Sequence, residues 1–168
     1  MAAEVCDSCV MAKHAAGSHP PSQSRAAQPL ALVHSDLMGP FEVESTGGNK
    51  YVLTAIDDFS GMAAIKTLKH KDQATAQLKI VINVWERETE YKLKKLRSDR
   101  GTEYNALEVW CAQQGIQRDK SVAYTPQQNG RAERFNRTIT ERVRAMLNSR
   151  GVAKKYWARA SVSKKIQL

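Results

Sequence analysis

Apolar and polar residues along this chain follow two periods, one typical of strands and one typical of helices. Three short apolar runs come first, at residues 30–37, 50–57 and 62–68. Two polar, glycine-containing segments separate them, Gly47-Gly48-Asn49 and Ser60-Gly61, and such residues favour tight turns. Short strands joined by tight turns predict an antiparallel meander.

The next segment changes to the helical period. Its apolar residues recur at offsets of 0, 4, 7, 8 and 11, as Ala74, Leu78, Val81, Ile82 and Trp85. This spacing is the apolar stripe of an amphipathic helix. Asp72 lies just before the stripe, and we expect its side chain to cap the helix.

Strand and helix patterns alternate through the second half of the chain. We expect a strand at 91–98, a helix at 106–114 that Gly115 ends, and a strand at 116–122. A polar loop at 124–129 precedes a long helix at 131–148, and a final helix follows at 154–162. The apolar positions of the long helix are Ala132, Phe135, Ile139, Val143, Met146 and Leu147. This order predicts an α/β fold with a five-stranded mixed sheet, its first three strands antiparallel, flanked by helices.

Composition and charge narrow the class of protein. The chain has 168 residues, of which 42% are hydrophobic and 26% charged, as in soluble globular proteins. No apolar run reaches bilayer length and no signal pattern is present, so we expect an intracellular protein with no membrane partner. The net charge is +9, and residues 118–159 alone carry eleven basic and three acidic residues, or +8. Such a segment favours a nucleic-acid partner, although a solvated helix face would look the same.

Three carboxylates occupy positions where a site could form. Asp36 and Asp99 follow apolar strand segments, where we expect strands to give way to loops, and Glu133 lies in the first turn of the long helix. Converging carboxylates repel unless a cation neutralises them, and Mg²⁺ or Mn²⁺ suits such hard oxygen ligands. Two such ions roughly 4 Å apart can activate an attacking oxygen and stabilise a leaving oxygen of a phosphodiester. Alternatively, the three residues are ordinary caps or exposed charges.

Four segments carry a family resemblance. LVHSDLMGP (32–40), KYVLTAIDDFS (50–60), LRSDRGTEY (96–104) and YTPQQNGRAERFNRT (124–138) resemble, in order, motifs of copia-type retrotransposon integrases. The resemblance implies a ribonuclease H-like fold and a catalytic, metal-binding triad at Asp36, Asp99 and Glu133. It implies that Mg²⁺ or Mn²⁺, two ions with DNA bound, supports trimming of DNA 3′ ends and then strand transfer. Within the second motif, we expect Asp57 and Asp58 to support the structure through hydrogen bonds.

The long helix also offers candidate DNA contacts. Glu133, Arg137 and Arg144 share one helix face, opposite the apolar stripe. A helix that presents a carboxylate to metal and arginines to phosphates would lie along a DNA backbone. The candidate nucleic-acid-binding residues are Tyr124, Gln127, Asn129, Arg131, Arg134, Arg137 and Arg144. The alternative is an ion pair between Glu133 and Arg137 within the helix.

We expect three regions along the chain. Residues 1–29 would be a disordered remnant of a zinc-binding module and linker, in which Cys6 and Cys9 are half a ligand set and hold no stable zinc. Residues 30–150 would be the integrase catalytic core, and 151–168 a truncated C-terminal helix. Cys111 lies in an apolar helical stretch, which predicts a buried thiol.

Three functions remain open at this point. The first is a metal-dependent polynucleotidyl transferase that acts on element ends and target DNA. The second is a catalytically inactive remnant that binds nucleic acid without sequence preference or dimerises. The third is a nuclease of the same ribonuclease H-like fold, which the motif at 124–138 disfavours. The resemblance also implies a homodimer or higher oligomer and, through the DNA target, a nuclear location.

Overall fold

A single five-stranded sheet forms the centre of the molecule. The computed structural model describes residues 25–98, 105–120 and 130–163. Its strands are β1 (Val33–Met38), β2 (Tyr51–Asp57), β3 (Ala63–Leu68), β4 (Lys95–Ser98) and β5 (Gln117–Lys120), and their order in the sheet is β3-β2-β1-β4-β5. β1, β2 and β3 pair antiparallel, whereas β4 pairs parallel with both β1 and β5. The predicted mixed sheet with three antiparallel leading strands is confirmed.

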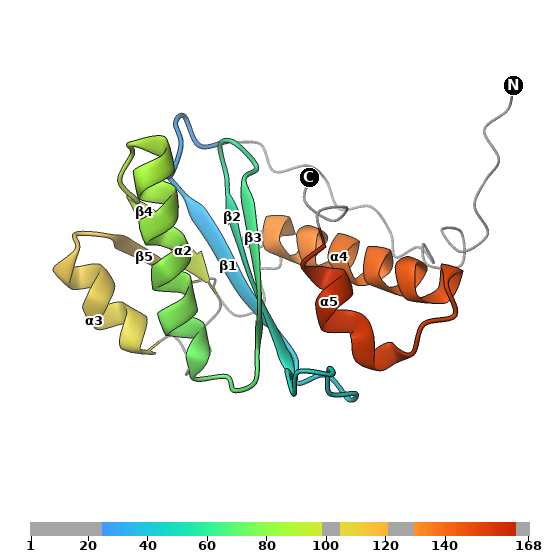
Figure 1. The fold of residues 1–168 in the computed structure, drawn as a ribbon. Coiled ribbons are helices and arrows are strands. Elements are labelled where there is room, and N and C mark those ends of the chain that lie inside the picture. The colour runs from blue at the N-terminus through green and yellow to red at the C-terminus, as the bar shows by residue number, and fades with distance from the viewer. Residues whose placement is uncertain (1–24, 99–104, 121–129, 164–168) are drawn as a thin grey trace, which may run out of the picture.

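Helices cover both faces of this sheet (Figure 1). α2 (Gln73–Thr89) and α3 (Asn105–Gln113) lie on one face, and α4 (Gly130–Ser149) and α5 (Trp157–Ser161) lie on the other. A short 3-10 helix, η3 (Lys154–Tyr156), leads into α5. None of the helices within the described ranges is long and apolar enough to cross a membrane. The result is a three-layer arrangement in which each face of the sheet has its own hydrophobic core.

The alternation of side chains along β2 explains the two cores. Leu53 and Ala55 join the core beneath α2 and α3, whereas Val52 and Ile56 join the core beneath α4 and α5. Because successive side chains of a strand point to opposite faces, Thr54 lies on the same face as Val52 and Ile56. The register of the sheet pairs Thr54 with Asp36 of β1. One polar pair therefore lies in the sheet on the side that α4 covers.

Three local predictions differ from the structure. Asp36 is not at a strand end: β1 continues to Met38 because its pairing with β2 extends to Val52. The strand expected at 91–98 begins only at Lys95, where pairing with the neighbouring strands starts. The side chain of Asp72 makes no capping hydrogen bond. Before α2, the Gln73 side chain instead accepts the backbone N–H groups of residues 69 and 70.

The C-terminal part of the described chain packs against the sheet through Trp157. Its indole Nε1 donates a 2.7 Å hydrogen bond to the backbone oxygen of Val43, and its ring lies 4.6 Å from the ring of Phe41 between centroids. The side chain belongs to the same core as Phe135 and Ile139 of α4. Through Trp157, α5 therefore packs against both α4 and the loop between β1 and β2.

Candidate active site

The contact between β1 and α4 brings together residues far apart in the chain. Asn136 of α4 donates a hydrogen bond from Nδ2 to Oδ2 of Asp36 over 2.5 Å. Its Oδ1 accepts a 2.8 Å hydrogen bond from the Thr54 hydroxyl of β2. The amide therefore joins a carboxylate on one strand to a hydroxyl on the next.

Burial makes this contact specific. Thr54 and Asn136 are 1% and 6% exposed, whereas Asp36 is half-buried. A buried amide without partners would cost free energy, so both polar ends of Asn136 need the partners that β1 and β2 provide. A charged acceptor strengthens the bond to Asp36 relative to a bond between neutral groups. Asn136 therefore fixes the orientation of the Asp36 carboxylate and the position of α4 over the sheet.

Glu133 lies on α4, three residues before Asn136. Residues three apart on a helix are surface neighbours, with about 5–6 Å between their Cβ atoms. The side chain of Glu133 is exposed, whereas Ala132 beside it is fully buried. The alternative ion pair with Arg137 is absent among the contacts of the described chain. Glu133 is thus a solvent-facing carboxylate one helical turn from the amide that binds Asp36.

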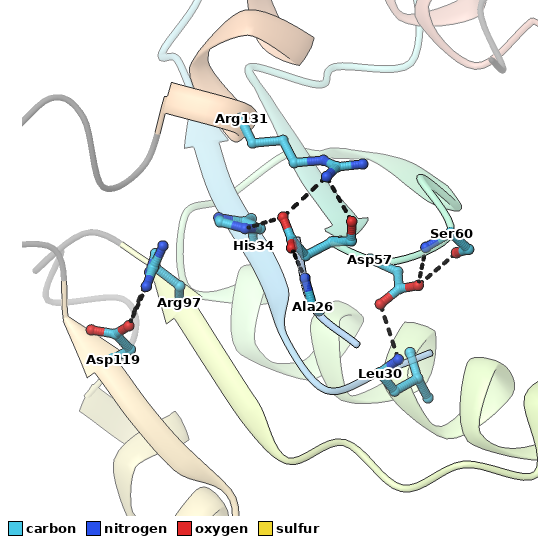
Figure 2. A network of polar contacts seen from close by, with 9 residues as sticks. Ala26, Leu30, His34, Asp57, Ser60, Arg97, Asp119 and Arg131 are labelled. Atoms are coloured by element: carbon cyan, nitrogen blue, oxygen red, sulfur yellow. Dashed lines mark hydrogen bonds and ion pairs between the residues drawn. The ribbon is translucent and has the colours of Figure 1, made fainter. Parts of the chain in front are cut away.

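A second polar network lies at the turn after β2 (Figure 2). Asp57 accepts the backbone N–H of Leu30 at 3.0 Å, the N–H of Ser60 at 2.8 Å and the Ser60 hydroxyl at 2.6 Å. Its carboxylate is fully buried. These bonds close the turn to β3 and tie the chain entering β1 to it. The prediction that Asp57 supports the structure is confirmed.

Asp58 receives donors from three separate segments. They are the Ala26 backbone N–H at 2.6 Å, His34 Nε2 of β1 at 3.2 Å and Arg131 Nη1 of α4 at 3.0 Å. In Figure 2, dashed lines mark these contacts of the labelled Ala26, His34 and Arg131. Asp58 thus also has the structural role predicted from the sequence.

Burial and nearby charges shift the pKa values of Asp58 and His34, which contact each other in this network. Burial by itself would raise the pKa of Asp58, but the N–H of Ala26, the Arg131 guanidinium and His34 outweigh it, so the pKa lies below its ordinary value. Burial lowers the pKa of His34, and the cations Arg97 and Arg131 add to this against the opposing effect of Asp58. Arg97 itself pairs with Asp119 of β5 at 2.6 Å.

The other predicted site residues fall into two groups. Asp99, Tyr124, Gln127, Asn129, Cys6 and Cys9 lie outside the described residues. Arg134, Arg137 and Arg144 of α4 are exposed to solvent. Arg131 is different, because its side chain is 23% exposed and faces Asp58.

Sequence reasoning missed Asn136 and His34. The one local signal for Asn136 is a polar residue next to Phe135, on the edge of the apolar stripe and one turn after Glu133. His34 is an isolated histidine in an apolar strand segment, a pattern that a satisfied core histidine also produces. For both residues the partners come from distant segments.

The carboxylate side chains at this site are of the kind that bind a divalent metal ion. The described residues contain no group of three or more potential metal ligands. Of the predicted triad, the structure describes Asp36 and Glu133. Both supply hard carboxylate oxygens of the kind that Mg²⁺ and Mn²⁺ prefer. The Asn136 amide, at 6% exposure, holds the half-buried Asp36 carboxylate in place. The chemistry of the donors therefore suits the expected metal.

Comparisons with known proteins identify the family of this chain. The family model described as integrase core domain matches residues 26–126. The chain is 46% identical over 157 residues to the retrovirus-related Pol polyprotein from transposon TNT 1-94 of Nicotiana tabacum, covering 92% of this chain and 12% of that polyprotein. It is 28% identical over 152 residues to the corresponding polyprotein from transposon RE2 of Arabidopsis thaliana, covering 90% of this chain and 10% of that one. The chain thus spans about a tenth of the length of these relatives.

A solved structure supports the fold. It is a chain from the cryo-EM structure of the simian T-cell lymphotropic virus intasome in complex with PP2A regulatory subunit B56 gamma. The TM-score is 0.64 at 15% sequence identity, and the match covers 82% of this chain and 49% of that chain. Together with the family match over residues 26–126 and the 46% identity to a transposon polyprotein, this likeness shows that the chain belongs to the integrase core domain family, as a retrotransposon integrase core with the ribonuclease H-like fold.

Proposed function

We propose that this chain is the catalytic core of an integrase that trims DNA 3′ ends and transfers them to target DNA with the help of divalent metal ions. The observation that carries the proposal is the hydrogen bond between Asn136 and Asp36. It holds the helix that bears Glu133 against the strand that bears Asp36. Two of the three carboxylates in the D-D-E motif pattern therefore lie on elements that touch each other.

The register of the sheet supports the proposal that Asp99 is near Asp36. β4 ends at Ser98, one residue before Asp99. In the parallel pairing of β1 and β4, His34 is the partner of Arg97. Each of these partners lies two residues before one of the two aspartates in the sequence. We propose Asp36, Asp99 and Glu133 as the catalytic residues and metal ligands.

The residues of this chain would orient and bind rather than form covalent bonds. Mg²⁺ or Mn²⁺, when bound, activates the attacking oxygen and stabilises the leaving oxygen of a phosphodiester. Asn136 holds one oxygen of Asp36 by a hydrogen bond, which limits the directions in which that carboxylate can offer its lone pairs. Glu133, exposed on the first turn of α4, has no competing ion pair among the described residues. These features suit a pre-organised metal site.

DNA is the proposed substrate because of charge and exposure. The net charge is +9, and Arg134, Arg137 and Arg144 project from α4 into solvent. Cations on the helix that also carries Glu133 would bind phosphates next to the reacting group. Tyr124, Gln127 and Asn129 precede α4 and complete the proposed contact surface. A homodimer or larger assembly and a nuclear location are part of the same proposal.

A branched DNA that mimics the strand-transfer product provides the test. Protein with Mn²⁺ should reverse the joining reaction and release the two product strands, whereas Asp99→Asn should give no detectable product. Asp119→Asn is the matched control, since Asp119 pairs with Arg97 outside the proposed triad. Equal product from wild type and Asp99→Asn would remove Asp99 from the site. No product from folded wild type would contradict the catalytic proposal.

A non-catalytic nucleic-acid-binding role is the second candidate, and the exposed arginines of α4 favour it. In that case DNA binding would weaken steeply with salt, because phosphate contacts release counterions. Added Mg²⁺ would weaken this binding as other salts do, and replacing the three acids would not weaken it. Cleavage of an RNA–DNA hybrid in preference to the branched DNA would instead support the nuclease alternative.

A further inference from the structure

Arg131 faces the protein and not the solvent. Its Nη1 donates to the backbone oxygen of Asp58 at 2.6 Å and to the Asp58 carboxylate at 3.0 Å. The guanidinium lies close over the turn between β2 and β3, since a Cβ placed on Gly61 would be 3.6 Å from Nη2. One arginine at the start of α4 thus binds both a main-chain and a side-chain oxygen of this turn.

The turn that receives Arg131 is itself held firmly. Asp57, fully buried, bonds to Ser60 within the turn and to Leu30 before β1. The Asp58 side chain, 9% exposed, also bonds to Ala26 and to His34 of β1. Segments from before β1, from β1 and from α4 therefore meet at two consecutive aspartates. By its contact with this turn, Arg131 is therefore held in position relative to the sheet.

The contact between Arg131 and Asp58 matters because Glu133 lies close to Arg131 on α4. Glu133 lies two residues after Arg131 and three residues before Asn136. Arg131 bonds to the turn after β2, and Asn136 bonds to Asp36 of β1 and Thr54 of β2. The exposed carboxylate is therefore bracketed by two side chains, both bonded to the sheet. Losing the bonds of Arg131 or of Asn136 would remove one of the two contacts that hold Glu133 in position.

We propose that the Asp58–Arg131 contact positions the first turn of α4, and with it Glu133, so that Arg131 acts through Glu133 instead of binding a DNA phosphate. Its catalytic consequence rests on the function proposed above. Because both N–H groups of Nη1 already serve two oxygens of Asp58, a phosphate contact through Nη1 would have to break this contact. Arg131 is on this account a positioning residue.

A double-mutant cycle tests the proposal, with Arg131→Gln, Asp58→Asn and the double variant. Asn keeps the shape of Asp58 and Gln keeps the stem of Arg131. Each single variant should lower kcat for the branched substrate by about 10- to 100-fold, the loss typical of a displacement near 1 Å. The double variant should be no worse than the poorer single variant, because the ion pair between Asp58 and Arg131 is already lost in each of them. KM for DNA should hardly change.

Arg134→Gln is the matched control, from an exposed arginine three residues further along α4. As a phosphate contact it should weaken DNA binding and reduce the salt slope by about 1. Arg131→Gln should leave that slope unchanged, and Arg131→Lys should recover part of kcat by restoring the charge. A reduced slope in Arg131→Gln with an unchanged kcat would overturn the positioning role.

Hydrogen exchange separates failure of this inference from failure of the proposed function. In wild type without DNA, the amides of residues 135–138 should exchange slowly, and Asp58→Asn should speed their exchange at least about tenfold. Slow exchange that Asp58→Asn does not change would overturn the contact even if the protein is an active integrase. Faster exchange in a protein with no activity would support the contact and contradict the catalytic function. Circular dichroism of each variant confirms that it is folded.

Discussion

The amide of Asn136 and the carboxylate of Asp36 are joined by a 2.5 Å hydrogen bond across 100 residues of sequence. The bond connects the helix of one proposed catalytic residue to the strand of another. Thr54 completes it from the neighbouring strand. The geometry of the proposed metal site therefore depends on a buried amide that is not itself a proposed metal ligand.

Replacing Asn136 should affect stability and catalysis together. Asn136→Ala removes the 2.8 Å acceptor of the Thr54 hydroxyl, which keeps only the Asp36 backbone oxygen at 3.4 Å, and removes one donor to the Asp36 carboxylate. We expect the free energy of unfolding to fall by about 1–3 kcal/mol, the cost of weakening buried polar contacts on one side only. Strand transfer should fall further than the folded fraction explains. Urea unfolding and a single-turnover assay measure the two effects.

Asn148→Ala is the control for Asn136→Ala, because Asn148 is exposed near the end of the same helix. A surface substitution of this kind should change the free energy of unfolding by less than about 0.5 kcal/mol. Equal strand-transfer rates for Asn136→Ala and wild type would show that the amide does not orient Asp36.

Acid should remove the contribution of Asp58 to stability. Its pKa in the folded protein lies below the ordinary value of 3.8, because the N–H of Ala26 and the charge of Arg131 outweigh the effect of burial. The folded state thus favours the carboxylate, and the stabilisation is complete above about pH 4 and declines as pH falls through the lowered pKa. The difference in unfolding free energy between wild type and Asp58→Asn should therefore be largest near neutral pH and shrink below pH 4.

Asp72→Asn serves as the reference in that titration, since Asp72 is exposed and makes no capping hydrogen bond. Its unfolding free energy should stay close to that of wild type at each pH. If the deficit of Asp58→Asn were the same at pH 3 and pH 7, the charge of Asp58 would not be the stabilising element.

Trp157 should be essential to the core beneath α4. It is 8% exposed, contacts Phe41 and donates to Val43. Trp157→Ala should lower the free energy of unfolding by about 3–5 kcal/mol, as expected for removing a large buried aromatic side chain. The adjacent Tyr156 is 40% exposed, so Tyr156→Ala should cost far less. Similar losses for the two variants, measured by urea unfolding, would argue against α5 as part of the core.

Cys111 should not react in the folded protein. The thiol is fully buried in the core beneath α2 and α3, and burial raises its pKa above the ordinary value. Since the thiolate is the reactive form, iodoacetamide at pH 8 should modify Cys111 only after unfolding. Mass spectrometry of the peptide that contains Cys111, with and without urea, measures this. Rapid modification of the native protein would show that α3 opens readily.

The order of elements could be predicted from the sequence because apolar periodicity is local. The runs at 50–57 and 62–68 and the stripe from Ala74 to Trp85 correspond to β2, β3 and α2. Strand ends were less predictable, since β1 reaches Met38 only through its pairing with β2. The cap predicted at Asp72 does not form, and the Gln73 side chain accepts the N–H groups of Lys69 and His70, which precede the helix.

The site was only partly predictable for the same reason. Motif resemblance indicated Asp36 and Glu133, but it gave no role to Asn136, whose partners lie 82 and 100 residues away. Arg131 looked like one more cation on a basic helix. Its partner Asp58 lies 73 residues away, and no local pattern connects the two. Contacts between residues so far apart in the sequence form only when the sheet folds, so local residue spacing does not predict them.

Binding of Mn²⁺ tests the central claim most directly, because the account requires Asp36, Asp99 and Glu133 to share divalent metal. Electron paramagnetic resonance measures free Mn²⁺ during a titration of the protein–DNA complex. Wild type should bind Mn²⁺, and Asp36→Asn, Asp99→Asn and Glu133→Gln should each weaken that binding at least about tenfold while DNA stays bound. Unchanged Mn²⁺ binding in the three folded variants would contradict a shared metal site.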